Sequence, residues 1–385
     1  MSQSRGVNLR NRFPGRRRFL KQSAALSAGA ATISAPGIVL GQVMPATVKV
    51  GLLHPVSGAL AASGQRCRDG ALTAIADINA AGGIGALGGA RLEAVLGDAR
   101  SRPQAGSGEV ERMNAAGVSA IVGAYASDIC LATTLAAARH GIAHLVDVGV
   151  ADAVVERGLA NTFRFGPGQG QIVQQALRRL QAMNAGADPM RTVMVVHDTS
   201  GFGSGAFRLL ARQLPACGFE IGDVVRHASE ARDLDRVVQR MKVLAPDLVI
   251  AASLGADHAL LVRTMRALGL DTPVFSTLGE EQAGYCIETA TRGVADPVVA
   301  GDPGFDPGHE RLIRLRQRVE AAGSLGYAQL MSYTAVWLLA DALERARSAA
   351  RDAVIEALAT STWAGHFMRY GPTRFVNGQN QGARA

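Results

Sequence analysis

Residues 47–83 read TVKVGLLHPVSGALAASGQRCRDGALTAIADINAAGG and contain the pattern from which the fold can be predicted. The first seven residues, 47–53, form an apolar run rich in β-branched side chains, which is typical of a buried strand. Residues 64–83 then place apolar side chains at helical spacing and end in Gly82 and Gly83, as helix C-termini often do. A buried strand followed closely by a helix predicts the first unit of a parallel α/β sheet.

Strand and helix patterns go on alternating after this unit. The next predicted elements of the first half are strand 91–99, helix 106–117, strand 118–124, helix 127–141 and strand 143–149. The order then restarts with helix 170–184, strand 191–198, helix 203–214, strand 219–225, helix 233–244, strand 247–253, helix 256–268 and strand 272–278. A strand at 294–301 and helical stretches at 308–322, 327–347 and 350–360 follow. We therefore expect an α/β protein with two similar lobes, each a mostly parallel sheet flanked by helices.

The formal net charge of +8 comes almost entirely from the N-terminal segment. Residues 1–41 hold seven of the 40 basic residues and none of the 32 acidic ones, so the remainder of the chain is nearly neutral. A nearly neutral body does not indicate a nucleic-acid partner.

The same segment has the three parts of an export signal. Residues 16–21 read RRRFLK, which matches the twin-arginine pattern R-R-x-F-L-K. Small, mildly apolar residues follow as far as Leu40, and the run is short and interrupted by Pro36, which disfavours a membrane anchor. We predict that residues 1–41 are a twin-arginine-type signal peptide cleaved near Gly41, and that the mature protein is periplasmic. An uncleaved anchor and a basic binding arm are the alternatives.

The residue types that usually carry catalysis or metals are present but not in the usual patterns. Cys67, Cys130, Cys217 and Cys286 form no C-x-x-C pair; we expect buried thiols, although three disulfide pairings are open. The sequence has no G-x-S-x-G elbow and no H-E-x-x-H motif. His54, His197 and His258 lie near predicted strand ends and are expected to be structural or surface residues. We predict a protein with no metal, cofactor or catalytic residue, and no enzymatic activity.

Candidate binding residues come from the loops that follow the strands, because ligands of parallel sheets bind beyond the carboxyl ends of the strands. In the first half, Ser57, Ser63 and Ser127 stand where a serine can cap a helix, or can cap it and also contact a ligand. In the second half, the glycines Gly201 to Gly205 after strand 191–198 resemble a dinucleotide-binding loop. Asp198, Thr199 and Ser200 stand between the apolar part of that strand and the glycines, which disfavours a nucleotide-dependent enzyme; we keep such an enzyme as an alternative.

Several stretches together resemble one known family. They are VGLLHPVSGALAASG (50–64), GALTAIADINAAGGI (70–84), AIVGAYAS (120–127), NTFRFGP (161–167), VVHDTSGFGSG (195–205), LVRTMRALGL (261–270) and GPTRFVNGQNQGA (371–383). Over residues 47–383 the chain resembles the leucine/isoleucine/valine-binding family of type I periplasmic solute-binding proteins, which serve ABC importers. The resemblance implies two lobes joined by a three-crossover hinge that close on a small solute, with an inner-membrane ABC permease and the twin-arginine export machinery as partners.

The resemblance also divides the chain. It implies that residues 42–168 begin lobe I, 169–297 form lobe II, 298–372 return to lobe I as helices, and 373–385 form the last crossover and the tail of lobe II. Family members continue with another strand pair after a segment like 371–383, so we expect a lobe II that is cut short.

The resemblance implies a carboxylate site. In this family a ligand carboxylate is held by a serine hydroxyl and backbone N–H groups, which correspond to Ser127 with Tyr125 and Ala126, and to Gly149. An aromatic residue of the second lobe corresponds to Phe202.

The chain departs from the family where an amino-acid ligand would place its ammonium group. Ala151, followed by Asp152, replaces a threonine, and Leu254 and Leu278 replace a tyrosine and a glutamate, with Glu280 two residues further on. Burying an ammonium without acceptors costs several kcal/mol, so an apolar or aromatic acid is favoured. A branched-chain or other hydrophobic amino acid is the alternative if Asp152 or Glu280 binds the ammonium, and an amide or urea ligand is the third.

Overall fold

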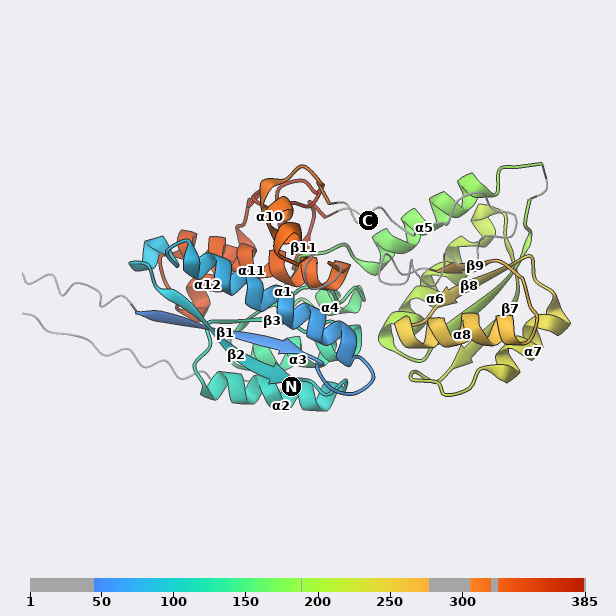
Figure 1. Ribbon diagram of the computed structural model, residues 1–385, viewed down its shortest axis with the longest axis horizontal. Helices are drawn as coiled ribbons and strands as arrows, with labels where there is room; N and C mark the ends of the chain where they lie inside the picture. The colour runs from blue at the N-terminus through green and yellow to red at the C-terminus, as the bar shows by residue number, and fades with distance from the viewer. Residues whose placement is uncertain (1–44, 188, 277–304, 320–324, 384–385) are drawn as a thin grey trace, which may run out of the picture. The chain divides into compact units, whose positions relative to one another are not determined.

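The strands of the computed structural model form two sheets (Figure 1). The structure describes residues 45–187, 189–276, 305–319 and 325–383. Within these residues the strand order is β10-β11-β5-β4-β3-β1-β2 in a seven-stranded sheet and β7-β6-β8-β9 in a four-stranded sheet. We call the seven-stranded sheet with its helices the first lobe, and the four-stranded sheet with its helices the second lobe. The predicted α/β fold with mostly parallel sheets flanked by helices is confirmed.

The first lobe is assembled from both ends of the chain. Its strands are β1 (Thr47–His54), β2 (Arg91–Asp98), β3 (Ala120–Gly123), β4 (Ala143–Val146), β5 (Thr162–Arg164), β10 (Phe375–Val376) and β11 (Gln379–Asn380). Its helices are α1 (Ala61–Ala80), α2 (Pro103–Ala115), α3 (Ser127–Arg139), α4 (Ala153–Glu156), α10 (Glu310–Val319), α11 (Tyr327–Ala346) and α12 (Arg351–Ala359), with the 3-10 turn η1 (Gly85–Leu87).

The second lobe comes from one continuous part of the chain. Its strands are β6 (Thr192–Asp198), β7 (Glu220–His227), β8 (Leu248–Ala252) and β9 (Val274–Ser276). Its helices are α5 (Gln169–Met183), α6 (Gly201–Gln213), α7 (Asp235–Leu244) and α8 (Gly255–Ala267), with the 3-10 turn η2 (Pro215–Cys217). The signal peptide predicted at 1–41 and the strand predicted at 294–301 lie outside the described residues.

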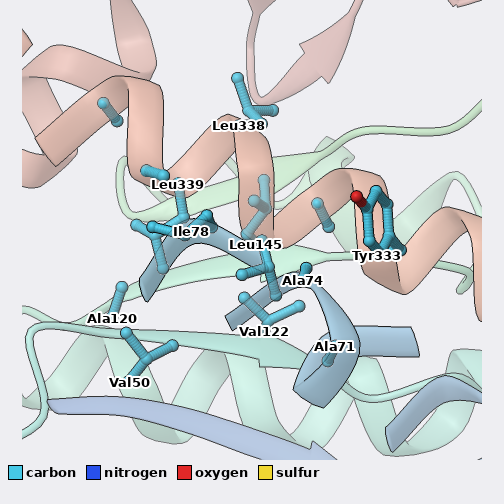
Figure 2. Close-up of a cluster of buried hydrophobic side chains, with 14 of the residues drawn as sticks. Val50, Ala71, Ala74, Ile78, Ala120, Val122, Leu145, Tyr333, Leu338 and Leu339 are labelled. Atoms are coloured by element: carbon cyan, nitrogen blue, oxygen red, sulfur yellow. The ribbon is translucent and has the colours of Figure 1, made fainter. Parts of the chain in front are cut away.

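Both faces of the first sheet are buried, as the continuous apolar runs of its strands predict. Successive side chains of β3 point to opposite faces, so Val122 joins one core cluster and Ile121 joins the other. On the Val122 face, α1 and α11 pack side by side over the sheet. Figure 2 shows this layer, with the labelled residues Val50, Ala71, Ala74, Ile78, Ala120, Val122, Leu145, Tyr333, Leu338 and Leu339.

Gly70 permits the close contact between α1 and α11. A Cβ atom at this position would lie 2.1 Å from the carbonyl oxygen of Gln329, which is far inside van der Waals contact. The sequence therefore places its smallest residue at a point where the backbones of the two helices are in close contact.

The C-terminal hairpin differs from our expectation for residues 373–385. We expected this segment to be the last crossover and the tail of the second lobe, but β10 and β11 pair with each other, and β11 pairs with β5 of the first lobe. Asn377 (φ +49°) and Gly378 (φ +76°) form the turn, a pair typical of tight hairpins. Phe375 packs edge-on against Phe163 with ring centroids 5.1 Å apart, which binds the hairpin to the first core.

Among the helices of the described residues, none combines the length and the apolar composition needed to cross a lipid bilayer.

Candidate functional site

Two loops meet at the carboxyl end of the first sheet. Strands β3 and β4 are parallel neighbours, so the residues that follow them emerge at the same edge. Residues 124–127 lead from β3 into α3, and residues 147–152 lead from β4 towards α4. We call these two segments the anchor loops.

Ser127 connects the anchor loops. It is the first residue of α3 and is 5% exposed, and its hydroxyl oxygen accepts a hydrogen bond of 3.2 Å from the N–H of Ala151. Our expectation that Ser127 caps the helix is wrong: Ala126 occupies the N-cap position, and no side chain caps this end. Among the described residues no acceptor pairs with the Ser127 hydroxyl hydrogen, so this hydrogen can donate to a ligand beside the N–H groups of the first turn.

Gly149 allows the second anchor loop to lie against α3. A Cβ atom on Gly149 would stand 2.6 Å from the sulfur of Cys130, so a larger residue would push the loop away from the helix. Tyr125, on the first loop, has a left-handed backbone conformation (φ +66°) that residues other than glycine rarely adopt. The first loop therefore holds one residue in an unfavoured backbone conformation, and the second loop needs a glycine to pack against α3.

The carboxylate of Asp147 lies beneath both loops and is fully buried. Its Oδ2 accepts hydrogen bonds from His54 Nε2 at 2.8 Å and from the Ser332 hydroxyl at 2.5 Å, while its Oδ1 faces the N–H groups of Val148 and Tyr125. Burial raises the pKa of the Asp147 carboxyl, but the hydrogen bonds outweigh this effect and hold the pKa below its usual value.

A buried arginine supports the second anchor loop from below. Arg164, on β5, is 2% exposed, and its guanidinium donates to the carbonyl oxygens of Val150 and Ala151 at 2.5 and 2.7 Å. It also pairs with Asp152 at 3.1 Å and donates to the Gln379 side chain at 2.6 Å. Sequence reasoning did not single out Arg164, although it lies inside the NTFRFGP motif.

Asp152 has structural partners on both carboxylate oxygens. One oxygen pairs with Arg164, and the other accepts a hydrogen bond of 2.8 Å from the N–H of Gly170, in the first turn of α5. The carboxylate that we considered as an ammonium acceptor is therefore already neutralised and hydrogen-bonded.

A model of the periplasmic binding protein family matches residues 47–385. The chain belongs to this family.

Individual relatives support the same assignment. The chain is 26% identical to Leu/Ile/Val-binding protein homolog 7 of Brucella abortus, over 94% of this chain and 90% of that protein. The substrate binding protein LivJ of the Streptococcus pneumoniae branched-chain amino acid transporter, solved with isoleucine, has 19% identity and a TM-score of 0.70 over 87% and 93% of the two chains. A solute binding protein of an ABC transporter from Rhodopseudomonas palustris, solved with 3,4-dihydroxybenzoic acid, has 17% identity and a TM-score of 0.68 over 86% and 88%. The two solved structures show a shared fold.

In the second lobe of this periplasmic binding protein, the carboxyl end of the sheet is organised by Asp198. Its carboxylate accepts hydrogen bonds from the N–H groups of Ser200 at 2.9 Å and Leu254 at 3.0 Å. Leu254 is the N-cap of α8 and is half-buried. Phe202, in the first turn of α6, is 3% exposed, and its carbonyl oxygen accepts from the Gln169 side chain at 2.7 Å. Leu278 and Glu280 lie outside the described residues.

The glycine-rich stretch that resembles a dinucleotide loop has a packing explanation. Ser200 caps α6 by accepting a hydrogen bond of 3.1 Å from the N–H of Gly203. A Cβ atom on Gly203 would lie 2.4 Å from the Asp198 carboxylate and 2.7 Å from the Ala252 carbonyl oxygen. A carboxylate at this helix N-terminus would repel a phosphate, so the geometry does not favour the nucleotide alternative.

The remaining candidate serines, Ser57 and Ser63, belong to neither anchor loop. Ser57 is exposed and donates to the Asp98 carboxylate at 2.6 Å, and Ser63 is the third residue of α1, whose N-cap is Leu60. Neither serine caps the helix.

One group in the described residues combines metal-ligand side chains: His54, Cys67 and Asp147 place ligand atoms within 4.8 Å of one another. Both oxygens of Asp147 already accept two hydrogen bonds each, so the geometry is that of a hydrogen-bonded network and we assign no metal to it. Cys67 and Cys130 carry buried free thiols, as we expected, whereas the free thiol of Cys217 is only half-buried; Cys286 lies outside the described residues.

A buried histidine near the site predicts acid sensitivity of the fold. His144, on β4, is fully buried with Nε2 3.0 Å from the Thr133 hydroxyl, and burial lowers its pKa to about 4. In the unfolded chain its pKa returns to about 6.5. Between these values the unfolded state binds more protons, so the free energy of unfolding falls as the pH drops from 6.5 to 4, by about 3 kcal/mol for this residue.

Urea denaturation at pH 7.0, 5.5 and 4.5 tests this expectation. The variant His144→Gln removes the titrating ring and should lose less stability across this range than the wild type. Equal losses in the two proteins would show that His144 does not contribute.

Proposed function

We propose that this protein is the extracytoplasmic substrate-binding component of an ABC importer and that it captures a small carboxylic acid. The observation that carries the proposal is the buried Ser127 hydroxyl, which accepts from Ala151 N–H and, within the described part of the chain, has no acceptor for its own hydrogen at the N-terminus of α3. A helix N-terminus with an adjacent hydroxyl donor favours an anionic group. The names of the relatives support a solute of this class, since they include binders of isoleucine and of a benzoic acid.

The ligand of this site is an acid without an α-amine. Ala151 offers a methyl group where an ammonium would need an oxygen, and Asp152 uses both oxygens on Arg164 and Gly170. Placing an ammonium against such groups leaves a buried charge without acceptors, at a cost of several kcal/mol. An apolar or aromatic carboxylate fits the described half of the site better than an amino acid does.

A hydrophobic amino acid is the second candidate. The name of the Brucella abortus relative supports it, and Glu280 would be the ammonium acceptor in that case. An amide or urea ligand, which would suit a sensor of the same fold, is the third candidate and lacks the negative charge that Ser127 and the helix N-terminus favour.

We further propose that residues 1–41 direct the folded protein to the periplasm through the twin-arginine machinery, where an inner-membrane permease receives the ligand. The RRRFLK pattern of residues 16–21 supports this route. Changing Arg16 and Arg17 to lysines should leave the protein in the cytoplasm, whereas changing Arg10 and Arg12 should not.

Matched ligand pairs give a direct test of the ligand class. Leucine and 4-methylpentanoate differ by the α-amine alone, and so do phenylalanine and 3-phenylpropanoate. We expect the acids to raise the melting temperature of the purified protein and to bind at least about 100-fold more tightly than the matching amino acids, because binding to the folded state stabilises it. Isothermal titration calorimetry gives each Kd.

Tighter binding of both amino acids would contradict the proposal and would make Glu280→Gln the next variant. Stabilisation by acetamide or urea alone would instead support the third candidate.

A further inference from the structure

We propose that Asp147 is a positioning residue for ligand binding, whose buried carboxylate sets the conformation of both anchor loops and is itself fixed by His54 and Ser332. This inference rests on the proposed function, because the anchor loops are the carboxylate site proposed above. Asp147 does not need to touch the ligand for this role.

The first oxygen of Asp147 contacts the backbone of both loops. Oδ1 accepts from Val148 N–H at 2.8 Å, one residue before Gly149, and from Tyr125 N–H at 3.4 Å, two residues before Ser127. The Tyr125 contact is long, and it restrains the residue whose backbone is in the left-handed region (φ +66°). A single oxygen therefore links the two segments that present donors to the ligand.

The second oxygen connects the same carboxylate to the rest of the first lobe. Oδ2 accepts from His54 at the end of β1 and from Ser332 on α11, which are 93 and 185 residues away in sequence. His54 and Ser332 are both fully buried. Their hydrogen bonds orient the carboxylate, so that Oδ1 can face the loops.

The charge of Asp147 makes this orientation sensitive to each donor. A buried carboxylate is tolerated only when hydrogen bonds replace water on its oxygens. Loss of one donor to Oδ2 leaves part of the charge unsatisfied, and we expect the carboxylate to turn towards another partner and so to weaken its contacts with Val148 and Tyr125. Removal of the Ser332 hydroxyl on α11 should therefore make the anchor loops less ordered.

The variant Ser332→Ala tests the proposal without changing the sequence of either anchor loop, and Thr334→Val is its matched control. Thr334 is two residues away on the same helix and equally buried, but its hydroxyl donates to the Leu330 carbonyl of its own helix. In the ligand-free protein, hydrogen exchange of the Val148 and Tyr125 amides should be at least about 10-fold faster in Ser332→Ala than in Thr334→Val or the wild type.

Binding of 4-methylpentanoate should follow the same order, with Kd about 10-fold weaker in Ser332→Ala and unchanged in Thr334→Val. A second pair separates positioning from general stability: His54→Gln keeps an N–H donor near the position of Nε2, while His54→Leu removes it. We expect the Val148 and Tyr125 amides to exchange at the wild-type rate in His54→Gln and faster in His54→Leu, even where both variants lower the melting temperature.

Equal exchange rates in Ser332→Ala and Thr334→Val, or in the two His54 variants, would overturn the inference. If 4-methylpentanoate does not bind the wild type, the proposed ligand class fails, but the exchange rates of the ligand-free protein still decide whether Asp147 orders the loops.

Discussion

Replacing Arg164 by methionine is expected to lower the free energy of unfolding by about 3–5 kcal/mol, because removal of one partner from a buried ion pair leaves the other groups unsatisfied. Methionine fills a similar volume, so the loss reports the missing charge and hydrogen bonds rather than a cavity. The carbonyl oxygens of Val150 and Ala151 each lose a charged donor and keep one backbone N–H, from Gln169 and Val154, while the Gln379 side-chain oxygen loses the Arg164 donor. Asp152 is 30% exposed in its side chain and can recover some hydration.

Urea denaturation of the wild type and Arg164→Met measures this loss. Arg314→Met is the matched control, because Arg314 also pairs with a carboxylate, that of Glu310, but the two side chains are 62% and 80% exposed. Exposed pairs of this kind contribute less than about 1 kcal/mol. Similar losses in the two variants would show that the buried arginine has no special structural role.

Replacing Ser127 by alanine is expected to weaken binding of 4-methylpentanoate by about 10- to 100-fold. A hydrogen bond to a charged group contributes about 1.5–3 kcal/mol, and each 1.4 kcal/mol corresponds to a factor of ten in Kd. The substitution also removes the acceptor for Ala151 N–H, which loosens the contact between the anchor loops. Titration calorimetry of the wild type and the variant gives the ratio.

Two further serine variants make this result specific. Ser57→Ala removes an exposed hydroxyl that donates to Asp98, and it should leave Kd unchanged. Ser127→Thr keeps the hydroxyl and should bind better than Ser127→Ala. If Ser127→Ala binds the acid as tightly as the wild type, the carboxylate is held elsewhere and the proposed site is wrong.

Much of the fold could be predicted because the long elements have strong local patterns. The strands β1, β6 and β8 are apolar and β-branched, and helices such as α1 and α11 have apolar residues at helical spacing. The short strands β5, β10 and β11 have two or three residues each and carry too little periodicity to be recognised. The Asn377-Gly378 pair was a usable hairpin signal, but it could not show which sheet the hairpin joins.

The site was predicted less completely, because its supports are far apart in sequence. The anchor loops could be found from strand ends and from family resemblance, since each loop is local. Asp147 and Ser332 are separated by 185 residues, so only the folded chain brings them together. Arg164 was hidden for another reason: the chain is rich in arginine, and no local pattern distinguishes a buried guanidinium from an exposed one.

The position of the C-terminal hairpin has a consequence for synthesis of the protein. Gln379, which holds the Arg164 guanidinium, and Asn380, which donates to the Phe165 carbonyl oxygen, are each separated by 215 residues from their partners. The second anchor loop can therefore gain the support of Gln379 only after the hairpin has been synthesised. The described strands of the second lobe lie between residues 192 and 276, so they can pair before the C-terminal hairpin has been synthesised. Nascent chains that stop before residue 379 should accordingly bind the ligand more weakly than chains that contain the hairpin.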